Sequence, residues 1–163
     1  MNTFRTKVLT LFICMLLTQI ACASVGVNIG QEAPDFSLKD IKNKPVSLKD
    51  FRGEKIVILD FWASWCGPCR SVIPELNKIQ KDYEEKDVQV LGINVGEAPA
   101  KVVAFKKKNM VKYPTLLDVK KAVAKKYRVT GIPNLILVDK DGVVQYNGHS
   151  SYELKNTLKK LGE

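Results

Sequence analysis

Apolar residues follow two kinds of pattern along the chain. Apolar runs typical of buried strands occur at residues 55–61, 88–95 and 134–138. Shorter extended segments are predicted at 36–38, 46–48, 113–117 and 143–146. Apolar residues with helical spacing predict helices at 67–83, 99–109, 119–127 and 150–161. Because strands and helices alternate and a hairpin comes near each end, we expect one α/β domain with a mixed central sheet between helices.

The N-terminus has the pattern of an export signal. Arg5 and Lys7 precede an apolar stretch at 8–17, and the small residues around Cys22 form a cleavage site ending at Ala23. We therefore predict a signal peptide at 1–23 and a single domain at 24–163. An uncleaved membrane anchor or a lipid on Cys22 are the alternatives, and either would give the only membrane contact that we expect.

The cysteines that remain after export form one close pair. The chain has four cysteines in 163 residues, and two of them fall in the predicted leader. This leaves Cys66 and Cys69, and a single pair does not make a framework of structural disulfides. A structural zinc site needs four ligands, and the exported part offers these two thiols and His149. We therefore predict no metal site.

The pair lies where the strand at 55–61 gives way to the helix at 67–83. Unpaired N–H groups and the helix dipole stabilise an anion at a helix N-terminus, so a thiolate is favoured at Cys66. A thiolate attacks disulfides, and a second thiol one turn away can release the mixed disulfide. The pattern predicts a redox site with Cys66 as the more exposed nucleophile and Cys69 as the resolving thiol.

Four motifs carry a resemblance to a known family. The segment DFWASWCGPC at 60–69 resembles the thioredoxin active site. APDF at 33–36, NVGE at 94–97 and TGIP at 130–133 resemble the extracytoplasmic TlpA/ResA-like thiol–disulfide oxidoreductases of the redoxin (AhpC/TSA) superfamily. The resemblance covers residues 30–162 in the right order. It implies a thioredoxin fold with an N-terminal β-hairpin and a central extension.

Two acidic residues gain roles from this resemblance. Asp60 stands in an otherwise apolar strand, where burial raises the pKa of a carboxyl. The matching thioredoxin position exchanges a proton with the deeper thiol, here Cys69. Glu97 resembles an active-site glutamate that acts on the cysteine pKa values and on substrate contact. The alternatives are a hydrogen-bonded strand-end aspartate and a solvated loop glutamate.

Five further residues are expected to form the substrate side of the site. Gly67 and Pro68 tune the cysteine loop, and this dipeptide resembles reducing thioredoxins more than oxidants. Pro133 matches the family's cis-proline, which would leave the backbone of Ile132 free to pair with an extended substrate. Trp65 would add an apolar rim. His149 receives no role.

The predicted activity is reduction of disulfides in exported proteins, with the Cys66–Cys69 disulfide as the only redox group and no separate cofactor. The resemblance implies a periplasmic or other extracytoplasmic location, apocytochrome c as a client and a membrane thiol carrier as electron donor. The net charge of +9 fits solvated lysine-rich helix faces, and we expect no nucleic-acid partner. A disulfide oxidase or isomerase, a peroxidase of the same fold and a metal-binding thiol chaperone remain alternatives.

Overall fold

The computed structural model describes residues 27–83 and 87–161. The predicted signal peptide at 1–23 lies outside these residues. Within the two described ranges, no helix is both long enough and apolar enough to cross a membrane.

A five-stranded mixed sheet forms the centre of the molecule, with the strand order β5-β4-β3-β6-β7. Strands β3 and β4 pair in parallel, and β5 pairs in parallel with β4. On the other side, β6 pairs antiparallel with β3, and β7 pairs antiparallel with β6. Their bounds are β3 Ile56–Trp62, β4 Val88–Val95, β5 Thr115–Asp118, β6 Asn134–Val138 and β7 Val144–Gly148. Every residue of β3 is buried, because both faces of the sheet are covered.

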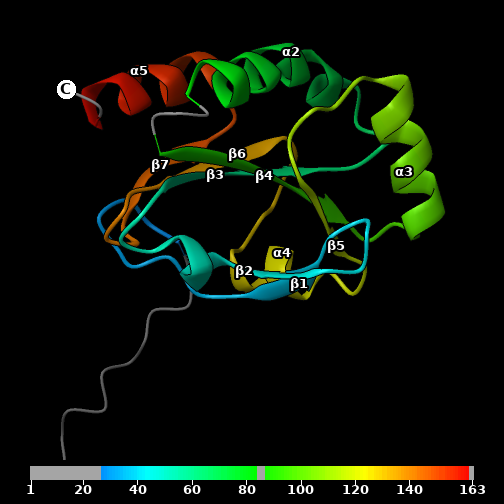
Figure 1. Cartoon of the computed structure of the whole chain (residues 1–163), viewed down its shortest axis with the longest axis horizontal. Coiled ribbons are helices and arrows are strands. Elements are labelled where there is room, and N and C mark those ends of the chain that lie inside the picture. Colours follow the sequence, from blue (N-terminus) through cyan, green and yellow to red (C-terminus); the bar gives the residue numbers. More distant parts are fainter. Residues whose placement is uncertain (1–26, 84–86, 162–163) are drawn as a thin grey trace, which may run out of the picture.

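Helices α2 (Gly67–Asp82) and α5 (Ser151–Leu161) lie together over one face of the sheet (Figure 1). Helix α3 (Pro99–Lys108) joins the same core at the side of β4 and β5. Side chains alternate along a strand, so Ile58 and Trp62 of β3 belong to this core. Asp60 lies between them and therefore faces α2.

The opposite face of the sheet is covered by the N-terminal part of the domain and by one short helix (Figure 1). A two-stranded hairpin, β1 (Ser37–Lys39) with β2 (Pro45–Ser47), is followed by the 3-10 helix η1 (Leu48–Phe51). Helix α4 (Ala122–Lys126) packs there as well. The predicted α/β class, the hairpin and the mixed sheet are all confirmed.

The helix expected at 119–127 is shorter than predicted. Lys121 has a left-handed backbone with φ 57°, so helical geometry begins only at Ala122. The reason is a turn made by Asp118, whose backbone oxygen accepts a hydrogen bond from the Lys121 amide. The Asp118 carboxylate then accepts one from the Ala124 amide at 2.8 Å, which satisfies a free donor of the first turn.

Candidate functional site

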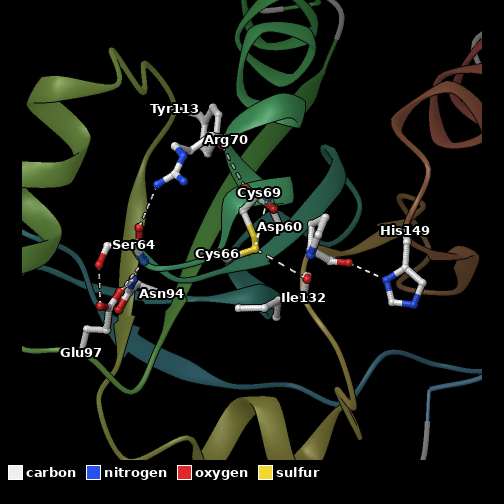
Figure 2. Close-up of a disulfide and its surroundings, with 11 residues drawn as sticks. Asp60, Ser64, Cys66, Cys69, Arg70, Asn94, Glu97, Tyr113, Ile132 and His149 are labelled. Atoms are coloured by element: carbon white, nitrogen blue, oxygen red, sulfur yellow. Dashed lines mark hydrogen bonds between the residues drawn. A yellow bond between two sulfur atoms is a disulfide. The ribbon is translucent and has the colours of Figure 1, made fainter.

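Cys66 and Cys69 form a disulfide at the start of α2, with their Cα atoms 5.3 Å apart (Figure 2). Cys66 is the residue that caps the helix, and its sulfur accepts a hydrogen bond from the Cys69 amide at 3.1 Å. Pro68 fits in the first turn because an N–H at that position has no partner within the helix. The predicted placement of the pair at a helix N-terminus is confirmed.

Both sulfur-bearing residues are covered in the disulfide form. Cys66 is 3% exposed and Cys69 is 1% exposed, so the expected difference in exposure is small. The sulfur of Cys66 lies 3.6 Å from the backbone oxygen of Ile132. A disulfide sulfur carries no hydrogen to donate, so this is a close approach. After reduction, a Cys66 thiol at this position could donate to that oxygen.

An open apolar groove lies beside the disulfide. Trp65 and Ile132 line it, together with Val95, Lys121, Ala124, Lys125, Val129, Thr130 and Gly131. Trp65 is 68% exposed, a rare position for so large an apolar side chain. Gly67 and Pro68 are also exposed at the surface next to it. The structure therefore brings the predicted substrate-side residues to one edge of the cysteine pair.

The peptide bond between Ile132 and Pro133 is cis, as the resemblance led us to expect. Pro133 itself is buried, and its backbone oxygen lies 2.5 Å from Nδ1 of His149. Because a carbonyl oxygen only accepts, Nδ1 carries the hydrogen in this contact. His149, to which the sequence assigned no role, thus holds the proline loop that faces Cys66 (Figure 2).

Asp60 is fully buried on the α2 side of the sheet, with 1% of its surface exposed. One carboxylate oxygen, Oδ2, accepts a hydrogen bond from the hydroxyl of Tyr113 at 2.9 Å. The other, Oδ1, has no partner among the described residues. Burial raises the pKa of Asp60 to about 7, against the opposing effect of the Tyr113 hydrogen bond. A carboxyl with this pKa can exchange protons near neutral pH.

Glu97 is buried beside the loop that leads into Cys66. Its carboxylate accepts hydrogen bonds from the Ser64 amide at 2.6 Å and from the Ser64 hydroxyl at 2.7 Å. The Asn94 amide group donates a third at 2.8 Å, and the Lys101 ammonium forms an ion pair with it at 2.7 Å. Burial raises the pKa of Glu97, but these donors together outweigh burial and lower it to about 2.

Glu97 therefore acts as an ionised clamp on Ser64, two residues before Cys66 (Figure 2). Its hydrogen-bond and ion-pair partners are Ser64, Asn94 and Lys101, and neither cysteine is among them. Through Ser64, Glu97 holds the loop that leads into Cys66, and its action on the cysteine pKa values stays a prediction.

Four residues at the site could not be recognised from the sequence: Ser64, Asn94, Tyr113 and His149. Each is an ordinary polar or aromatic residue with no motif of its own. Tyr113 lies 53 positions from its partner Asp60, and Ser64 lies 33 positions from its partner Glu97. Only Ser64 and Asn94, which lie within the matched segments at 60–69 and 94–97, carried any signal.

The chemistry of the site is that of the cysteine pair. Among residues 27–83 and 87–161, no group of three or more His, Cys, Asp or Glu side chains is arranged to hold a metal ion. The redox group is the Cys66–Cys69 disulfide itself, which can open and close by thiol–disulfide exchange.

Known proteins are similar to this chain. Residues 29–147 match the model of the AhpC/TSA family. The thiol-disulfide oxidoreductase ResA of Bacillus thuringiensis is 34% identical over 163 aligned residues, which cover 90% of this chain and 94% of that protein. The thioredoxin-like protein YneN of Bacillus subtilis is 40% identical over 124 residues, covering 74% of this chain and 71% of that protein.

A solved structure is also similar to this chain in fold. The thioredoxin domain of a thiol-disulfide oxidoreductase from Bacteroides vulgatus superposes with a TM-score of 0.77 at 28% identity, covering 85% of this chain and all of that one. The five-stranded mixed sheet and the cysteine pair at the start of α2 fit the same fold. The chain belongs to the AhpC/TSA family and is one of its thioredoxin-like thiol–disulfide oxidoreductases.

Proposed function

We propose that this protein is an exported oxidoreductase that reduces disulfides in extracytoplasmic proteins. The observation that carries the proposal is the cysteine pair at the N-terminus of α2, with Asp60 buried on the face that α2 covers. The Gly67-Pro68 dipeptide between the cysteines favours the reducing direction, since it resembles that of reducing thioredoxins.

The reaction runs in two exchange steps. In the reduced protein, the Cys66 thiolate attacks one sulfur of a client disulfide, and the other client sulfur leaves as a thiolate that takes up a proton. Cys69 then gives its proton to Asp60 and attacks the Cys66 sulfur. This breaks the mixed disulfide, releases the client as a dithiol and closes the Cys66–Cys69 disulfide, so that two electrons have passed to the client.

The client binds along the groove beside the disulfide. Trp65 and Ile132 provide apolar contacts there, and Gly67 and Pro68 leave the approach to Cys66 free of large side chains. The backbone at Ile132, held by the cis bond to Pro133, pairs with an extended client segment.

Export and electron supply complete the proposal. The leader pattern at 1–23 supports an extracytoplasmic location, where a membrane thiol carrier would return the disulfide to the dithiol. Apocytochrome c, whose haem-binding cysteines must be reduced, is the proposed client. A retained leader would keep the domain at the membrane surface.

Cysteine variants test the two-step reaction. The change Cys69→Ser removes the resolving thiol, so the full chain should accumulate a mixed disulfide with a model client such as insulin. The change Cys66→Ser removes the attacking thiolate, so turnover and trapping should both be lost. Non-reducing gel electrophoresis and insulin-reduction rates measure the two effects. Normal turnover by the Cys66→Ser protein would contradict the proposal.

The reduction potential decides between a reductase and a disulfide oxidase of the same fold. A potential near that of thioredoxin, about −270 mV, supports a reductase, and one near about −120 mV supports an oxidase. The potential can be measured by equilibrating the cysteine pair with glutathione buffers.

A further inference from the structure

Tyr113 is the hydrogen-bond partner of the buried Asp60 carboxyl, and neither the cysteine motif nor the family resemblance assigns it a role. Its hydroxyl donates to Oδ2 of Asp60 at 2.9 Å (Figure 2), and the residue is 1% exposed. We propose that Tyr113 is a positioning residue that holds this carboxyl ready to take the proton of Cys69. The inference rests on the proposed function, because it requires Asp60 to act on Cys69.

The backbone of β4 leaves room for the Tyr113 ring at Gly92. Gly92 of β4 pairs with Asp60 of β3 across the sheet. A Cβ atom on Gly92 would lie 2.9 Å from Cε2 of Tyr113 and 3.0 Å from Nε1 of Trp62. Real Cβ contacts are not this short, so only glycine lets the ring cross β4 and reach Asp60.

Two backbone contacts hold the segment that carries the ring. The Gly92 amide donates to the backbone oxygen of Pro114 at 2.9 Å. The Lys106 ammonium on α3 donates to the backbone oxygen of Tyr113, and its nitrogen lies 3.4 Å from the hydroxyl oxygen of Thr115. The backbone of the segment that carries the Tyr113 ring is thus held by contacts other than the one with Asp60.

Among the described residues, Tyr113 is the only one that donates a hydrogen bond to the Asp60 carboxyl. The titratable residues of the core on this side of the sheet are Tyr113, Tyr146, the partly buried Tyr83 and the two cysteines at the start of α2. Lys106 binds the far side of Tyr113 at its carbonyl oxygen. Burial, and then the nearby Asp60, raise the pKa of Tyr113 well above its ordinary value. The hydroxyl therefore keeps its proton and can donate to the ionised carboxyl.

The hydrogen bond favours the ionised form of Asp60, which is the form that accepts a proton. Without it, Asp60 would hold its proton to higher pH, and fewer molecules at neutral pH could deprotonate Cys69. The rate of the second exchange step rises with pH, and the pH at which it reaches half of its maximum should then be higher. The first step, attack by Cys66, should keep its pH dependence.

The change Tyr113→Phe keeps the ring and removes the donor, and Tyr127→Phe is its matched control. Tyr127 is 2% exposed and donates its hydroxyl to the Pro34 oxygen at 2.6 Å on the other face of the sheet. Stopped-flow reduction of insulin by the reduced full chain gives the rate as a function of pH. We expect the midpoint for release of the mixed disulfide to move up by about one pH unit in Tyr113→Phe and not in Tyr127→Phe.

Further variants separate the two hypotheses. Asp60→Asn should slow the second step and remove its midpoint, and failure to do so would overturn the proton role of Asp60 in the proposed function. If Asp60→Asn behaves as expected but Tyr113→Phe retains the parent's profile, the role of Tyr113 is overturned alone. Gly92→Ala, which pushes the ring away, should act like Tyr113→Phe. NMR titration of the Asp60 carboxyl in the oxidised chain should show the same upward move, and an unchanged midpoint there also contradicts the inference.

Discussion

At the scale of single residues, the two buried carboxylates of the site have opposite environments. Asp60 has one donor and a raised pKa, whereas Glu97 is surrounded by donors from Ser64, Asn94 and Lys101 and has a lowered one. Burial penalises the charge in both cases, and the number of donors decides which form is favoured. This difference suits Asp60 to proton exchange and Glu97 to a fixed structural charge.

The Glu97 clamp can be tested with Glu97→Gln. An amide offers one acceptor atom and turns two hydrogens toward the remaining donors, so a buried donor loses its partner. We expect the free energy of unfolding at pH 7 to fall by about 1–3 kcal/mol. Urea unfolding measures the loss, and Glu54→Gln at an exposed site serves as the control. Equal stability of the two variants would show that the clamp contributes nothing.

At the scale of elements, α2 and α4 form the two sides of the site. Helix α2 presents the cysteine pair from its first turn, and α4 supplies Ala124 and Lys125 to the groove. Helix α4 has only five residues, too few to be stable without outside support. That support comes from Asp118 at the end of β5, whose carboxylate accepts from the Ala124 amide.

We expect Asp118→Ala to loosen the first turn of α4. Loss of such a cap costs about 1 kcal/mol, which corresponds to roughly fivefold faster local opening. Amide hydrogen exchange at Ala124 should therefore speed up by about that factor. Asp141→Ala, at an exposed position in the turn before β7, should leave exchange at Ala124 unchanged. An unaltered rate in Asp118→Ala would contradict the capping role.

At the scale of the whole molecule, the two carboxylates shape stability against pH in opposite directions. The pKa of Glu97 is lowered from 4.5 to about 2, so its contribution is complete above pH 4.5 and is lost as the pH falls toward 2. The pKa of Asp60 is raised from 3.8 to about 7. The folded protein then binds the proton more tightly than the unfolded chain, and stability falls as the pH rises from about 4 to 7.

The change Asp60→Asn should remove this loss on the alkaline side. We expect the oxidised parent to lose roughly 3 kcal/mol of unfolding free energy between pH 4 and pH 8 relative to the variant. Denaturant unfolding at both pH values gives the comparison. A variant whose stability falls as steeply as the parent's would show that Asp60 ionises as freely in the folded protein as in the unfolded chain.

The sequence by itself determined the strands and helices, the position of the cysteine pair and the class of chemistry. These features depend on spacing within a few residues, as in the apolar run at 55–61 or the two-residue gap between Cys66 and Cys69. It also placed Asp60 in a buried strand and Pro133 before the next strand, because those positions belong to local motifs. The sequence did not predict the late start of α4, because the left-handed turn at Lys121 contains no glycine that would indicate it.

Only the tertiary structure decided the partners of these residues. The order of the strands places β4 beside β3 and β5 beside β4, and this brings Tyr113, two residues before β5, to Asp60 across 53 positions of sequence. The same arrangement brings Glu97 to Ser64 and, at the other side of the site, His149 to the oxygen of Pro133. Hydrogen bonds across such distances leave no periodic pattern in the chain, because they depend on which strands become neighbours after folding.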